Sequence, residues 1–205
     1  MSGDARVVER EDRSNPSRGK MRLRSKALIV LLVLFGAFLG LLRPLGLVRP
    51  FQMPTSGMAP AVLPGDHLMM DGLTYLVRKP HRGDIIVFKT DGIQAPLPAG
   101  MIYIKRVVGE PGERLRITEG KLYVNDKLIS LRNAAGEIVY AYSPWSKYLM
   151  SGTDTVTVPN GHYFVLGDNS TNSSDSRMWG FVPAGNIMGR AGIRYWPRNR
   201  IGGIE

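Results

Sequence analysis

The hydrophobic pattern of this chain changes near residue 50, and that change limits the folds the chain can adopt. Residues 27–42 read ALIVLLVLFGAFLGLL, sixteen residues without a charge. After residue 50, short apolar segments alternate with Pro and Gly, and no stretch keeps a long helical period. The sequence therefore predicts one apolar helix near the N-terminus, followed by a mainly β domain.

The apolar helix is long enough to cross a membrane only if it continues past residue 42. A span needs about 20 residues, so we predict a transmembrane anchor over 27–48, with Arg43 reaching the membrane interface. A cleaved signal peptide would instead need small residues after the apolar run. The segment that follows, RPLGLVRPFQ, contains prolines and bulky residues and favours an uncleaved, single-pass anchor.

The flanking charges predict an orientation for this anchor. Residues 1–26 carry eight Lys or Arg and four acidic residues, which gives a net charge of +4. We expect this basic tail to be disordered and cytosolic, because it lacks apolar periodicity and because positive flanks stay inside. Residues 49–205 would then form an exported domain on the outer, or periplasmic, side of the inner (plasma) membrane, with the lipid bilayer as a partner.

The predicted β domain consists of folded antiparallel sheets or a barrel. Alternating and β-branched segments predict strands at 83–89, 101–109, 114–129, 161–167 and 187–196, the third being a three-stranded meander. Residues 131–158 match no element, and we assign them to an insert around 110–158.

Composition excludes several functions. The chain has no cysteine, so disulfides, thiolate catalysis and Cys-based zinc sites are ruled out. Its net charge is +10, but it contains no recognisable nucleic-acid-binding motif, so no nucleic-acid partner is expected. The three histidines assemble neither a catalytic triad nor a metal site, and we expect no metal or organic cofactor.

Lys105 is the residue with the most informative position. Side chains alternate along a strand, so Lys105 shares a face with Met101, Tyr103 and Val107. A lysine there is either an edge residue whose amine reaches solvent or a desolvated amine. Desolvation lowers the pKa of a lysine and makes it a possible general base.

The segment GDNSTNSSDSRMWG at 167–180 is a second candidate region. Such a polar run is usually a loop of Asx and Ser turns. Here it follows an apolar strand, and an Asp175–Arg177 ion pair would hold the loop beneath a site.

Together with the preceding anchor, five blocks of sequence resemble bacterial type I signal peptidases, which are membrane-bound Ser-Lys endopeptidases. The blocks are FQMPTSGMAPAVLPGD (51–66), RGDIIVFK (82–89), YIKRVVGEPGE (103–113), GDNSTNSSDSRMWGFVP (167–183) and MGRA (188–191). The resemblance implies a mostly β fold and removal of signal peptides from exported preproteins after small residues at positions −1 and −3.

The resemblance also implies residue roles. Lys105 matches the general base, Ser173 matches the serine that orients it, and Asp175 and Arg177 match a supporting ion pair. The family reads Pro-Ser-x-Ser-Met at its nucleophile, which is the serine before Met, whereas this chain has Gly57 in that place.

The missing serine leaves the nucleophile to a neighbour. Thr55 stands where the family has a serine that helps form the oxyanion hole. In an extended loop Ser56 would face away from Lys105, but glycine permits a twist that turns Ser56 towards it. We predict Ser56 as nucleophile and Lys105 as base, with the Gly57 N–H and the Thr55 hydroxyl stabilising the oxyanion.

Two alternatives remain open from the sequence. One is an inactive homologue that binds signal peptides or membrane-protein tails without cleavage. The other is a peptidase of the same fold with a specialised substrate, such as a pilin or a conjugation protein.

Overall fold

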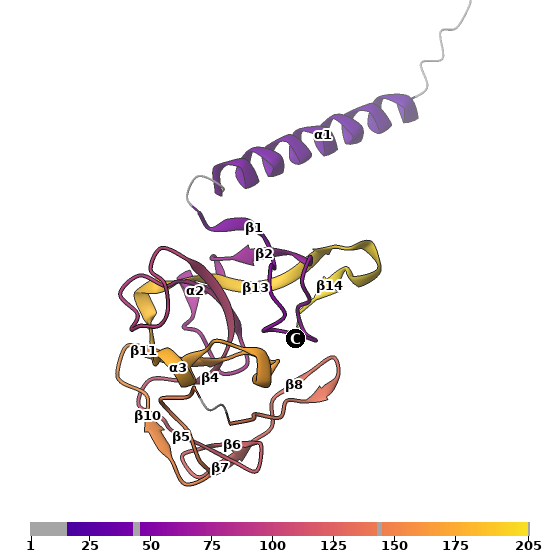
Figure 1. Cartoon of the computed structure of the whole chain (residues 1–205). Helices are drawn as coiled ribbons and strands as arrows, with labels where there is room; N and C mark the ends of the chain where they lie inside the picture. The colour runs from indigo at the N-terminus through magenta and orange to yellow at the C-terminus, as the bar shows by residue number, and fades with distance from the viewer. Residues whose placement is uncertain (1–15, 43–45, 143–144, 205) are drawn as a thin grey trace, which may run out of the picture. The chain divides into compact units, whose positions relative to one another are not determined.

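The computed structural model describes residues 16–42, 46–142 and 145–204 (Figure 1). The chain divides into two compact units between Leu42 and Arg43. The first unit contains helix α1, Pro16–Leu42, in which the large apolar side chains between Leu28 and Phe38 are exposed. The second unit is the β domain. The two units are described separately.

Helix α1 differs from the predicted anchor at both ends. It begins inside the tail that was expected to be disordered, because the Arg, Lys, Met and Leu residues at 18–26 all favour helix. It ends at Leu42, and Val48 already belongs to strand β1, so 27–48 is not one helix. Within the described ranges, no helix has both the length and the apolar content needed to cross a membrane. The earlier part of the tail, 1–15, lies outside the described residues.

The main sheet of the β domain has eight strands, all paired antiparallel, in the order β1-β2-β13-β3-β4-β11-β12, with β14 paired to β13 (Figure 1). Its strands are β1 Val48–Gln52, β2 His67–Asp71, β3 Ile85–Lys89, β4 Ile102–Gly109, β11 His162–Leu166, β12 Val182–Pro183, β13 Ile187–Trp196 and β14 Gly202–Gly203. The order places β13, from the end of the chain, between β2 and β3. The predicted mainly β class is confirmed.

A second sheet is formed by the predicted meander and one later strand, in the order β10-β5-β6-β7. These strands are β5 Arg114–Thr118, β6 Lys121–Val124, β7 Lys127–Ile129 and β10 Thr155–Thr157. Glu119, Asn125 and Asp126 adopt positive φ at the two turns, as short hairpin loops require. The three-stranded meander is confirmed.

The segment 131–158, which matched no predicted element, contains little regular structure. Strands β8 Arg132–Asn133 and β9 Gly136–Glu137 form a small ribbon, and β10 lies near the end of the segment. Tyr140 and Leu149 are buried in the core beneath the second sheet, so this insert is packed against the domain. Residues 143–144 lie outside the described residues.

Short helical turns complete the domain. They are α2 Thr74–Val77, α3 Ser176–Trp179 and the 3-10 turns η1 Ser170–Asn172, η2 Ala184–Asn186 and η3 Arg198–Arg200. The sequence did not predict them, because four-residue helices are too short to show a period. Helix α3 begins at Asp175, whose carboxylate caps it by accepting a hydrogen bond from the Arg177 N–H.

The centre of the main sheet is buried on both faces. Alternate residues of β3 belong to two different apolar clusters, Ile85 and Val87 to one and Ile86 and Phe88 to the other. Strand β4 pairs with β3 on one side and with β11 on the other. Folding therefore removes a polar side chain on β4 from contact with water, unless that side chain faces a cavity.

Candidate active site

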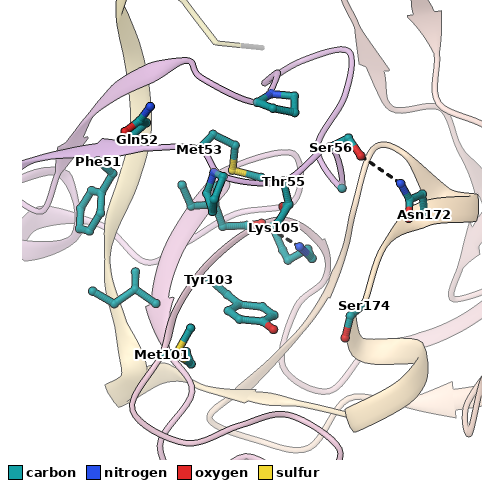
Figure 2. A pocket seen from close by; sticks show the side chains of 15 residues that line it. Phe51, Gln52, Met53, Thr55, Ser56, Met101, Tyr103, Lys105, Asn172 and Ser174 are labelled. Atoms are coloured by element: carbon teal, nitrogen blue, oxygen red, sulfur yellow. Dashed lines mark hydrogen bonds between the residues drawn. The ribbon is translucent and has the colours of Figure 1, made fainter.

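A cavity of about 660 Å³ opens where three segments of the β domain meet (Figure 2). These segments are the end of β1 with the loop that follows it, the start of β4, and the loop that contains η1. The residues that line the cavity include Met53, Thr55, Ser56, Gly57, Ile102, Lys105 and Asn172.

Lys105 lies at the inner end of this cavity and is only 5% exposed. Its ladder partner is Ile86 on β3, which is fully buried. The ammonium nitrogen Nζ lies 3.2 Å from the Ile104 carbonyl oxygen and 5.3 Å from the centre of the Tyr103 ring. Of the two readings that the sequence left open, the structure therefore favours the desolvated lysine, and Lys105 still borders the cavity.

This burial determines the protonation chemistry of Lys105. Loss of water lowers the pKa of the Lys105 amine below its ordinary value of 10.5, while the carboxylates of Asp175 and Asp168 oppose that change. Burial is the larger effect. The neutral amine is thus favoured more than in a solvated lysine, as a general base requires.

The Asp175–Arg177 pair forms as predicted, and it is completely buried. Arg177 donates from Nε to Oδ1 and from Nη2 to Oδ2 of Asp175, both at 2.8 Å. Arg177 also donates to the Ser170 carbonyl oxygen at 2.7 Å, and the Gly167 N–H donates to Asp175 at 3.1 Å. The ion pair therefore links the start, the middle and the end of the 167–177 loop, next to the end of β11.

A second buried ion pair was missed from the sequence. Arg106 follows Lys105 on β4 and points to the other face, where Nε and Nη2 contact the two oxygens of Asp168 at 2.8 and 2.7 Å. Both side chains are almost completely buried. Two features of the sequence pointed to this pair: strand alternation places Arg106 on the face opposite to Lys105, and Asp168 follows the β11 segment closely. The pair was missed because the two positions are 62 residues apart.

The predicted nucleophile, Ser56, lies at the rim of the cavity and is turned towards Asn172 (Figure 2). Its Oγ accepts a hydrogen bond of 3.0 Å from the Asn172 side-chain amide. Thr55 also lines the cavity and is exposed. In Figure 2 the Ser56 side chain points away from Lys105, so bringing the two together requires the 55–57 backbone to turn.

Gly57 is the loop residue that faces Lys105. A Cβ built on Gly57 would lie 3.6 Å from Lys105 Nζ, 3.7 Å from Ser173 Oγ and 3.4 Å from the Asn172 carbonyl oxygen. The φ angle of Gly57 lies outside the left-handed region, so the backbone itself does not require glycine. Within the part of the chain that the structure describes, the Gly57 N–H has no hydrogen-bond partner.

Ser173, the predicted orienting residue, is close to the same point. Its Oγ is buried and has no hydrogen-bond partner among the described residues. Gly167 is what allows this close packing, since a Cβ there would lie 2.1 Å from Ser173 Oγ and 2.4 Å from the Gly57 carbonyl oxygen. The structure thus brings Lys105, Ser173 and Gly57 together and leaves Ser56 to one side.

Part of the cavity lining is apolar. Met53 and Ile102 border the cavity. Val62 does not, because it is completely buried in the core with Met58.

The chain is similar to known proteins along most of its length. The family model for signal peptidase, peptidase S26, matches residues 24–196. A probable signal peptidase I-2 from Synechocystis sp. is 39% identical over 151 residues, which is 73% of this chain and 64% of that protein. A signal peptidase I from Leptolyngbya laminosa is 36% identical over 152 residues, 73% of this chain and 70% of that protein.

Similar proteins also occur in plants. The thylakoidal processing peptidase 1 of Arabidopsis thaliana is 36% identical over 160 residues, which is 76% of this chain but 44% of that protein. The match therefore spans less than two thirds of some of these relatives, while it includes most of this chain.

Proposed function

Because the chain belongs to the peptidase S26 family of signal peptidases, we propose that it is an endopeptidase that removes signal peptides from exported preproteins, with Lys105 as the general base. The observation that carries this proposal is Lys105, which is 5% exposed yet borders a cavity of about 660 Å³. A buried amine with a lowered pKa beside such a cavity is suited to removing a proton from an attacking oxygen.

The cavity sets the expected mode of substrate binding. An extended segment of the preprotein lies between the 53–57 loop and the start of β4, where exposed strand edges offer backbone hydrogen bonds. Small side chains at positions −1 and −3 fit against Met53 and Ile102. The unpaired Gly57 N–H is placed to donate to the oxyanion that forms on the cleaved carbonyl.

The assignment of Ser56 as nucleophile stays a prediction, as does the oxyanion role of the Thr55 hydroxyl. For Ser56 to act, its hydroxyl must release the 3.0 Å hydrogen bond from Asn172 and turn towards Lys105. The same observation favours a second candidate function, an inactive homologue that binds signal peptides without cleaving them. In that case the cavity would serve recognition alone.

Membrane association is also part of the proposal. The large apolar side chains of α1 are exposed between Leu28 and Phe38, and an exposed apolar helix of this kind favours a lipid surface. The expected result is that the full chain sediments with membranes after alkaline washing. Recovery in the soluble fraction would contradict membrane association and would leave the peptidase assignment unaffected.

Cleavage of a purified preprotein by the full chain in detergent micelles tests the enzymatic part. Lys105→Ala should lower kcat/KM by about 10²–10⁴-fold, the usual contribution of a general base. Lys127→Ala, at an exposed lysine of β7, is the matched control and should leave cleavage unchanged. Binding of the signal peptide without cleavage by the unmodified chain would establish the inactive homologue instead.

A further inference from the structure

Three polar groups surround the point to which a side chain at position 57 would project. They are Lys105 Nζ, Ser173 Oγ and the Asn172 carbonyl oxygen, all within 3.7 Å of that point. We propose that this small space is a water-binding site, and that the bound water, in place of a serine hydroxyl, attacks the peptide bond. The inference rests on the proposed function and concerns the identity of the attacking group.

The geometry of the space suits a water molecule. The Cβ point lies 3.4 to 3.7 Å from the three polar groups. The proposed water lies farther from the Gly57 Cα than a bonded Cβ would, at a position where these groups come within the roughly 3 Å of a hydrogen bond. Buried waters typically make about three hydrogen bonds to polar groups that otherwise lack partners.

The donors and acceptors also match. The Asn172 carbonyl oxygen accepts one proton of the water, and the unprotonated amine of Lys105 accepts the other. The Ser173 hydroxyl donates to the water oxygen. Each of the three groups therefore has one role, and the second proton of the water points at the base that will remove it.

Ser173 provides an independent reason to place a ligand here. Its Oγ is buried and has no partner among the described residues. A buried hydroxyl without a hydrogen bond costs free energy, so native structures rarely leave one in that state. The point beside Gly57 lies 3.7 Å from this hydroxyl.

The Ser56 hydroxyl does not compete for this position. Ser56 Oγ is held by the Asn172 amide at 3.0 Å and points away from Lys105 in Figure 2. The Ser56 carbonyl oxygen is also fixed, by the Asn169 side-chain amide at 3.2 Å. The point beside Gly57, in contrast, lies 3.6 Å from Lys105 Nζ.

The reaction then proceeds without a covalent intermediate. The water oxygen forms a bond to the scissile carbonyl carbon while one of its protons passes to Lys105 Nζ, and the carbonyl electron pair moves onto its oxygen, which faces the Gly57 N–H. As the C=O bond re-forms, the C–N bond breaks and Lys105 returns the proton to the leaving nitrogen. The products are a carboxylic acid and an amine, and Lys105 is again neutral.

Filling the space tests the proposal. In Gly57→Ala the added Cβ makes only van der Waals contacts, at 3.4 Å or more, and the backbone angle is permissive, so the chain should fold normally. We expect kcat/KM for preprotein cleavage to fall by about 100-fold or more, with the melting temperature unchanged. Gly185→Ala is the matched control, because a Cβ there has no neighbour within 4 Å, and it should cleave normally.

Two further measurements identify the attacking group. A loss of cleavage in Ser56→Ala as large as that in Lys105→Ala would overturn the water mechanism in favour of Ser56. Mass spectrometry of the acid-quenched reaction should find no acyl group on the unmodified chain, and an acyl group on any serine would also overturn the mechanism. Gly57→Ser is the positive control, since its introduced hydroxyl faces Lys105 and should become acylated.

The outcomes separate this inference from the function on which it rests. If the unmodified chain cleaves and Lys105→Ala does not, while Gly57→Ala cleaves normally, the water site is wrong and the peptidase assignment stands. If the unmodified chain cleaves no preprotein, both are wrong.

Discussion

The two sides of the cavity differ in how closely the fold constrains them. On one side, Lys105 lies on a strand paired on both edges, with the buried pairs Arg106–Asp168 and Asp175–Arg177 close by. On the other side, the loop around Ser56 and Gly57 has an exposed rim, and Ser56 is bound to an exposed asparagine. Lys105 is therefore held in place by the core, whereas Ser56 and Gly57 are held in place by loop contacts.

This difference shows where the chemistry of the site can change. Altering the base side disturbs buried charges and apolar packing together, so it affects folding as well as catalysis. Altering the loop side affects exposed hydrogen bonds and a space of about one methyl group. Substitutions on the two sides should therefore differ in their effect on the free energy of unfolding.

Asp175→Asn should have the largest effect, because it leaves the buried guanidinium of Arg177 without an anionic partner. Breaking a buried pair in this way costs about 3–5 kcal/mol. The measurement is urea unfolding of the chain. The control is Asp126→Asn, at an exposed ion pair with Arg114, where about 0–1 kcal/mol is expected. An equal loss of unfolding free energy in Asp175→Asn and Asp126→Asn would show that the buried ion pair stabilises the fold no more than the exposed one.

Lys105→Met should stabilise the chain at neutral pH. The folded state lowers the pKa of Lys105 below 10.5, so between the folded and unfolded pKa values the unfolded chain binds more protons, and stability rises with pH. The penalty of burying the amine is fully present below the folded pKa and is lost above 10.5. Each unit of pKa depression corresponds to about 1.4 kcal/mol.

Unfolding free energies of Lys105→Met and the unmodified chain at several pH values provide the measurement. The increase in unfolding free energy caused by Lys105→Met should be largest at low pH and should become smaller as the pH approaches 10.5. Cleavage by the unmodified chain should rise with pH through the same folded pKa. A gain that stays constant with pH would mean that the amine is solvated and carries its ordinary charge.

Asn172→Ala should have the smallest effect. Asn172 is exposed, and its side-chain amide donates to Ser56 Oγ at 3.0 Å, so its loss should change stability by less than about 0.5 kcal/mol. The unfolding midpoint in urea measures this change. A much larger loss would show that the loop side is as strongly constrained as the base side, and a rise in cleavage would indicate that releasing Ser56 activates its hydroxyl.

Much of the β domain was predictable from the sequence because its strands carry strong local patterns. The meander at 114–129 and the segment 187–196 appear as strands close to their predicted bounds. Alternation on β4 placed Lys105 on an apolar strand face, but it did not decide whether the amine was buried. The insert at 131–158 was not predictable, because its buried residues, such as Tyr140, are held by contacts distant in the chain rather than by a local period.

The candidate site divides in the same way. The Asp175–Arg177 pair is two residues apart and was found from spacing, whereas Arg106–Asp168 joins strand β4 to the loop after β11 and was missed. The direction of the Ser56 hydroxyl depends on Asn172, which is 116 residues away. Local alternation predicts which way a strand side chain faces, but it does not predict which distant group will bind a loop hydroxyl.

Backbone atoms help to fix the course of the 54–60 loop, together with the buried side chain of Met58. Asn169 donates from its backbone N–H to the Gly57 carbonyl oxygen and from its side chain to the Ser56 carbonyl oxygen, each at 3.2 Å. Carbonyl oxygens are present whatever residue occupies these positions. A change of side chain at 56 or 57 therefore keeps both acceptors, so the loop can hold its path while the groups that it presents to the cavity vary.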